Sequence, residues 1–172
     1  MSQFNVLYLL VSGASTARRI PELIEVLSGQ MEALVTVLTP NALRVVSPRE
    51  LAMVPGHHVV ESYFDEVILP RPAEGVVLIA PCTFNTLNKL AQGIADNLAL
   101  SIAAEAIGRG TPVIVAVSVN PPLWAHPRAK QSVDVLRSWG VQVIDPVADG
   151  DYLTMADNNV LLAAVQQALR GA

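Results

Sequence analysis

Hydroxyl and amide side chains gather in four short segments of the sequence, each directly after an apolar run. The segments are Gly13-Ala14-Ser15-Thr16, Thr39-Pro40-Asn41, Thr83-Phe84-Asn85-Thr86 and Ser118-Val119-Asn120. Where such a segment joins a strand to a helix, free backbone N–H groups and the helix dipole favour an anion. The four segments therefore predict a phosphate-binding site at which several of them meet.

The kind of phosphate follows from what these segments lack. The first and the third have neither the glycine spacing of a dinucleotide-binding fingerprint nor the lysine of a P-loop, which favours a mononucleotide-type phosphate. Serine, threonine, asparagine and glycine are also ordinary cap and turn residues, so each segment alone is better explained by local structure. Only the recurrence of the pattern after successive strands favours a shared ligand site, and both interpretations stay open at this point.

Five short apolar segments rich in β-branched residues precede or connect these loops, and they cover residues 5–11, 33–38, 76–80, 112–117 and 141–144. Apolar residues at helical spacing lie between them, beginning with Ile20, Leu23, Ile24 and Leu27. This alternation predicts an α/β fold: a doubly wound, mainly parallel sheet flanked by helices, as in a Rossmann-like or flavodoxin-like three-layer sandwich. With 172 residues and no linker, the chain is expected to form a single domain over residues 1–172.

Proline and capping signals refine this outline. Ser47, Pro48 and Glu50 have the spacing of a capping box with proline in the first turn, which predicts a short helix. Pro81 is expected to end the strand over 76–80. The double proline Pro121-Pro122 is expected to forbid a helix and to hold an extended loop.

The remaining segments are predicted from their periodicity. Residues 55–73 are the least regular, with possible short strands at 59–60 and 67–69. Beyond Pro81 one helical face is formed by Leu87, Leu90, Ala91, Ile94 and Ala95. Gly93 and Asp96 indicate a break, after which a second helix runs over about 96–108. Two more helices are expected over 127–139, with Gly140 as its stop, and over 160–169.

Composition narrows the range of partners. Apolar residues make up 52% of the chain and charged residues 15%, an excess that indicates subunit interfaces beyond the core of one sheet. The net charge of −4 without clusters of lysine or arginine argues against nucleic acid and anionic membranes. No apolar run approaches the roughly 20 residues of a membrane helix, and no signal peptide is seen, so a cytoplasmic protein is expected. The single cysteine, Cys82, excludes an intrachain disulfide, and no metal site is predicted.

The most distinctive stretch of the sequence is Pro81-Cys82-Thr83-Phe84-Asn85-Thr86, continued by Lys89-Leu90-Ala91-Gln92-Gly93-Ile94-Ala95-Asp96-Asn97-Leu98. It resembles the Pro-Ala-Ser-Ala-Asn-Thr motif, with its continuation, of the homo-oligomeric flavin-containing cysteine decarboxylases. That family includes phosphopantothenoylcysteine decarboxylase and the lantibiotic-peptide cysteine decarboxylases. Asn120 and Trp124 resemble its second motif, Pro-x-Met-Asn-x-x-Met-Trp, while the turns at residues 12–15 and 39–42 resemble its first two flavin loops.

This resemblance implies a bound FMN and names its contacts. The phosphate end would be contacted by Gly13, Ala14 and Ser15, and the length of the cofactor by Thr39 and Asn41. Phosphate and ribityl would be held by Thr83, Phe84, Asn85 and Thr86, while Ser118 would approach the isoalloxazine. Asn120 would face a small carboxylate substrate and donate a hydrogen bond to it. The resemblance further implies a homo-oligomer, a trimer or a dodecamer, with the flavin between subunits.

The sequence departs from the family pattern where the reaction is concerned. Val67 stands at the position of the family's catalytic histidine and cannot transfer a proton. The segment Asp149-Gly150-Asp151-Tyr152 stands where the coenzyme-A branch has a flap with Cys-Gly-Asp, and an aspartate cannot supply thiol redox chemistry. The histidines are interpreted as loop residues, in the case of His57 and His58, or as structural, in the case of His126. Cys82 is interpreted as a small packed residue.

Three functional hypotheses follow from the resemblance. The leading one is an FMN-binding enzyme that catalyses flavin-dependent oxidative decarboxylation of a small, cysteine-like carboxylate. The alternative is a non-catalytic or regulatory FMN-binding oligomer, because the decarboxylase histidine is absent. The weaker enzyme hypothesis is a flavin prenyltransferase, whose motifs resemble Ser12-Gly13-Ala14-Ser15 and Pro81-Cys82-Thr83. Its acidic residue is replaced by Asn120, and its lysine has no match other than Arg109.

Overall fold

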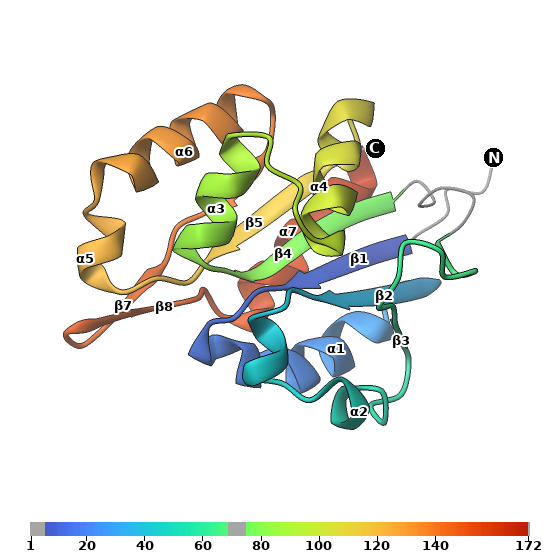
Figure 1. Ribbon diagram of the computed structural model, residues 1–172. Coiled ribbons are helices and arrows are strands. Elements are labelled where there is room, and N and C mark those ends of the chain that lie inside the picture. Colours follow the sequence, from blue (N-terminus) through green and yellow to red (C-terminus); the bar gives the residue numbers. More distant parts are fainter. Residues whose placement is uncertain (1–5, 69–74, 172) are drawn as a thin grey trace.

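A computed structural model describes residues 6–68 and 75–171. Its centre is a six-stranded sheet in the order β3-β2-β1-β4-β5-β6, in which every neighbouring pair is parallel (Figure 1). The strands are β1 (Val6–Val11), β2 (Ala33–Leu38), β3 (His58–Val59), β4 (Gly75–Cys82), β5 (Val113–Val117) and β6 (Gln142–Ile144). The order reverses between β1 and β4, as in doubly wound folds.

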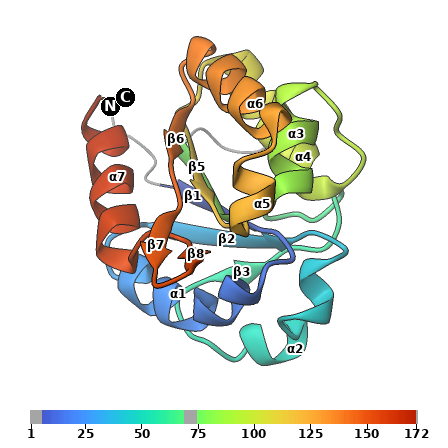
Figure 2. The same ribbon diagram turned by 90° about the vertical axis from the view of Figure 1, so that its left-hand side faces the viewer.

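Helices cover both faces of the sheet, which makes three layers (Figures 1 and 2). One face packs against α1 (Ile20–Ser28) and α7 (Asn158–Gly171), and the other against α3 (Phe84–Ala91), α4 (Leu98–Arg109) and α6 (Pro127–Ser138). Because side chains alternate across a strand, β1 sends Leu7 and Leu9 into the first core and Tyr8 and Leu10 into the second. The predicted α/β architecture is confirmed.

Shorter elements lie in the connections. They are the 3₁₀ turns η1 (Ser15–Arg19) and η2 (Ala42–Arg44), the four-residue helices α2 (Pro48–Leu51) and α5 (Pro121–Trp124), and a separate hairpin of β7 (Val147–Asp149) and β8 (Tyr152–Thr154). The short helix predicted at Ser47-Pro48 is confirmed, and the Ser47 side chain caps it by accepting a hydrogen bond from the Glu50 N–H. No helix among the described residues is long and apolar enough to cross a bilayer.

Two predictions based on proline were wrong. Strand β4 continues through Pro81 to Cys82, because its pairing with β5 shifts register between Ile79 and Cys82 and so requires no N–H from proline. Pro121 and Pro122 begin the helix α5 instead of preventing it. They occupy the first turn, where backbone N–H groups have no helical partner in any case.

Two further predictions were wrong for lack of tertiary information. Val67 and Ile68 lie in a turn, while Leu69, the last residue of that predicted strand, lies outside the described residues. Ile94 and Ala95 do not continue the apolar face of α3, which ends at Ala91, and both are exposed. The helix that follows begins at Leu98 with Asn97 as its cap, close to the predicted start.

Hydrogen bonds continue beyond the ends of the paired strands and fix the turns that follow them. The Ser12 hydroxyl, at the end of β1, donates to the Pro81 carbonyl oxygen at 2.6 Å and accepts from the Thr83 N–H at 2.9 Å. The Thr39 N–H donates to the Val11 carbonyl and the Ser118 N–H to the Cys82 carbonyl, both at 2.9 Å. These contacts place the turns after β2, β1, β4 and β5 side by side at one edge of the sheet.

Ser12→Ala removes both hydroxyl hydrogen bonds of a residue that is only 1% exposed. The Thr83 N–H then loses its partner, so we expect the free energy of unfolding to fall by roughly 1–3 kcal/mol in urea titrations. Ser138→Ala is the control, because that hydroxyl lies on the exposed end of α6 and, among the described residues, bonds only to the Val135 carbonyl oxygen. A control effect within about 0.5 kcal/mol is expected. Equal effects of the two substitutions would contradict the structural role of Ser12.

Candidate functional site

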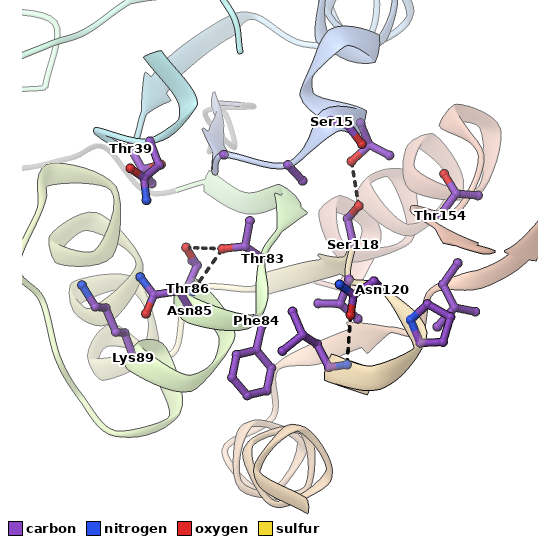
Figure 3. Close-up of a pocket in the computed structure, with 18 of the residues that line it drawn as sticks. Ser15, Thr39, Thr83, Phe84, Asn85, Thr86, Lys89, Ser118, Asn120 and Thr154 are labelled. Atoms are coloured by element: carbon purple, nitrogen blue, oxygen red, sulfur yellow. Dashed lines mark hydrogen bonds between the residues drawn. The ribbon is translucent and has the colours of Figure 1, made fainter. Parts of the chain in front are cut away.

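A cavity of about 840 Å³ opens at the carboxyl-terminal edge of the sheet, within the usual size range of ligand sites (Figure 3). Its walls are the turns after β1, β2, β4 and β5, together with the β7–β8 hairpin. Figure 2 looks toward this edge, with α5 and the hairpin in front. Every residue predicted to contact FMN or substrate lines it: Gly13, Ala14, Ser15, Thr39, Asn41, Thr83, Phe84, Asn85, Thr86, Ser118 and Asn120.

The start of α3 forms one wall of the cavity. Thr83 caps this helix, because its hydroxyl oxygen accepts from the Thr86 N–H at 3.3 Å, and the same hydroxyl donates to Thr86 Oγ1 at 3.2 Å. The Thr86 hydroxyl proton is therefore available to a ligand. The N–H groups of Phe84 and Asn85 belong to the first helical turn, where no intrahelical acceptor exists. Hydroxyls, N–H groups and the helix dipole together suit an anion.

The turn after β1 closes against two neighbouring turns. Thr16 and Ser118 join their hydroxyls at 2.7 Å, which links the turns after β1 and β5. Gly13 lies so close to the turn after β2 that a Cβ there would stand 2.7 Å from the carbonyl carbon and the Cβ of Asn41. Glycine is thus required at residue 13 for these two turns to meet.

The side-chain amide of Asn120 has two roles, one for its oxygen and one for its nitrogen. Its side-chain oxygen accepts from the Leu123 N–H at 3.0 Å and so caps α5. This bond fixes the orientation of the side chain and leaves the amide NH₂ to donate to a ligand. Beside it, the ring of Phe84 meets that of His126 edge to face, with centroids 5.3 Å apart.

The charged side chains of the cavity are few. Lys89, on α3, is the one cation among its described lining residues, and its ammonium lies 2.5 Å from a carboxylate oxygen of Asp96. Cys82, adjacent to the Thr83 turn, is completely buried, and this burial raises the pKa of its thiol well above the usual range. A thiol that stays protonated is no nucleophile, which agrees with the prediction that Cys82 is a packed residue.

The hairpin is the part of the site that the sequence analysis missed. Asp149, Tyr152, Leu153 and Thr154 line the cavity from β7 and β8. The available signal was Gly150-Asp151, a two-residue hairpin turn with glycine at its first position, where Gly150 has a φ of +60°. The sequence predicted a counterpart of the flap in the coenzyme-A branch at this segment, but not two strands.

Arg19 holds the chain that leaves the hairpin. Its guanidinium donates to the carbonyl oxygens of Met155 and Ala156, both at 2.9 Å, and to the Asn158 side chain at 3.0 Å. Arg19 ends η1, the turn that begins with Ser15, so the hairpin is fixed to an element that itself lines the cavity. The planar guanidinium of arginine carries several N–H donors in a fixed arrangement, so this one side chain can bond to all three acceptors.

No histidine reaches the described lining of the cavity. Val67, at the position of the family's histidine, lies in a turn and is 47% exposed. The His57 ring bridges Thr36 Oγ1 and the Leu51 carbonyl, each at 2.8 Å, while His58 is exposed on β3. His126 caps α6 by accepting from the Arg128 N–H. Within the described ranges, no three His, Cys, Asp or Glu side chains are grouped to hold a metal ion.

The residues present fit an FMN molecule. The helix start capped by Thr83 and the hydroxyls of Ser15 and Thr86 suit its phosphate, while the polar chains of Asn41 and Asn85 suit the ribityl hydroxyls. Apolar lining suitable for a flavin ring comes from Phe84, Val119, Leu123 and Leu153. The fit of FMN is thus supported by the chemistry of the lining residues.

Comparison with known proteins agrees with the geometry. A solved structure described as the FMN-dependent cysteine decarboxylase SpaF superposes with a TM-score of 0.81 and 29% identity, covering 96% of this chain and 97% of that one. The phosphopantothenoylcysteine decarboxylase HAL3 of Malus domestica is 35% identical over 97 residues, or 53% of this chain and 45% of that protein.

A third relative is the coenzyme A biosynthesis bifunctional protein CoaBC of Thermococcus kodakarensis, 28% identical over 116 residues. That match takes in 64% of this chain but only 28% of the relative, so the chain spans less than half the length of either curated relative. The model of the family described as Flavoprotein matches residues 1–170. The predicted resemblance is confirmed, and the chain belongs to the Flavoprotein family.

Proposed function

We propose that residues 1–172 form a single domain that binds FMN in this cavity. The observation that carries the proposal is the row of hydroxyl-bearing turns that meets the start of α3 at the carboxyl edge of the sheet. The phosphate is held by residues 13–15 and by the 83–86 turn, and the cofactor extends past Thr39 and Asn41 toward Ser118. The similarity to SpaF, an FMN-dependent cysteine decarboxylase, supports the choice of cofactor.

The proposed reaction is the oxidative decarboxylation of a small, cysteine-like carboxylate. Bound FMN supplies an acceptor for two electrons. The chain contributes binding and orientation: the Asn120 amide donates to the substrate carboxylate, and Leu123 and Leu153 exclude water around it. Substrate positioning of this kind can supply much of a rate enhancement without a protein base.

A second candidate is an FMN-binding oligomer without turnover. It is favoured by the position of Val67, which lies in an exposed turn and offers no proton-transferring group. A prenyltransferase is less well supported, since Arg109 ends α4 beside Glu105 and does not line the cavity.

Assembly into a homo-oligomer, a trimer or a dodecamer, is part of the proposal. Large apolar side chains are exposed on the monomer, among them Met53 at 82% and Phe64 at 81%. Methionine and aromatic residues are enriched at protein interfaces relative to the rest of the surface. The high apolar content of the sequence also favours contacts between subunits.

FMN binding can be measured by the quenching of flavin fluorescence. Thr86→Val removes a hydroxyl that we place against the phosphate, so the dissociation constant for FMN should rise by about tenfold or more while that for riboflavin changes little. Thr111→Val, in the loop before β5 and away from the cavity, is the matched control. A wild-type protein that leaves FMN fluorescence unchanged would remove the proposal.

Asn120→Asp separates the two roles of this residue. Aspartate keeps an oxygen to cap α5, so unfolding should be unchanged, whereas Asn120→Ala should cost about 1 kcal/mol. Aspartate also loses the amide donor and repels a carboxylate, so release of carbon dioxide from N-acylcysteines should fall by about a hundredfold. If the FMN-loaded wild type releases no carbon dioxide, the non-catalytic candidate is the correct one.

A further inference from the structure

The wall of the cavity formed by the hairpin presents a carboxylate beside an aromatic ring. Asp149 and Tyr152 are directly opposite each other in the antiparallel pairing of β7 and β8. Directly paired residues project to the same face of a hairpin, and both of these line the cavity. Tyr152 is 75% exposed, so its ring is available to a ligand.

The Asp149 carboxylate has no oppositely charged partner among the described residues. It has no hydrogen bond or ion pair with the residues that the structure describes, and Lys89, the cation of the lining, is paired with Asp96. Figure 3 shows Lys89 on the opposite side of the cavity from Thr154 of β8. The hairpin wall therefore carries a net negative charge, whereas the wall at α3 favours anions.

We propose that this pair selects a substrate whose far end is an ammonium group and that carries no phosphate. An ammonium donates charge-assisted hydrogen bonds to a carboxylate and is attracted to the face of a tyrosine ring. A phosphate in the same place would meet the Asp149 charge without a cation beside it. The proposal rests on the proposed function, because Asn120 is taken to hold the substrate carboxylate.

This selectivity distinguishes the chain from relatives named for a phosphorylated substrate, such as the phosphopantothenoylcysteine decarboxylase HAL3. The substrate class is a cysteine-like carboxylate extended by a chain that ends in an amine. Leu123, Pro121 and Leu153 also line the cavity and provide an apolar surface for that chain.

The test compares three probes of equal chain length: an N-(ω-aminoacyl)cysteine, its uncharged N-acyl analogue and its ω-phosphooxy analogue. Their dissociation constants are measured by calorimetry on the full chain, with and without FMN. We expect the amine to bind about tenfold more tightly than the uncharged probe and the phosphate most weakly. Asp149→Asn should abolish the preference, and Asp149→Lys should reverse it.

Asp151→Lys is the matched control, because Asp151 lies in the same hairpin turn but does not line the cavity. The Asp151→Lys variant should prefer the amine probe to the same extent as the wild type. Equal affinities for the three probes, or the same reversal in both lysine variants, would overturn the proposal. The probes are also measured without flavin, so a failure of this proposal can be told apart from a failure of FMN to bind.

Discussion

Four turns far apart in the sequence become one site because hydrogen bonds between neighbouring strands continue into the turns that follow them. Ser12 bonds to Pro81 and Thr83, the Thr39 N–H to Val11, and the Ser118 N–H to Cys82. These bonds set the turns in a fixed row before any side chain contacts a ligand. The positions of the hydroxyl groups thus depend on the register of the parallel sheet, which the two apolar cores stabilise.

Much of this arrangement could be predicted from the sequence. Continuous apolar runs identified the central strands, and the carboxyl ends of parallel strands share an edge, so their polar turns had to lie together. Predictions from single residues were less reliable. Proline was expected to end β4 and to forbid α5, but a register shift and a first helical turn each accommodate a residue without an N–H. The hairpin strands have only three residues each, too few for a periodic signal.

The cavity has two walls with different chemistry. The wall at α3 is built from hydroxyls and first-turn N–H groups, while the wall at the hairpin carries Asp149 and Tyr152. The motifs of the sequence lie mainly on the first wall, which is why they indicated a cofactor and said little about the reaction. The residues that we propose to select the substrate are those of the second wall and Asn120, the cap of α5. Asn120 would thus combine helix capping with ligand recognition.

Arg19 joins the turn after β1 to the hairpin wall through three hydrogen bonds from the end of η1 to the chain that leaves β8. The turn after β1 and the hairpin therefore share an anchor. With FMN and substrate bound as we propose, their sites would be linked: any factor by which the first ligand changes the affinity for the second is the factor by which the second changes the affinity for the first. The Arg19 guanidinium, which does not line the cavity, connects the two elements on which these ligands would rest.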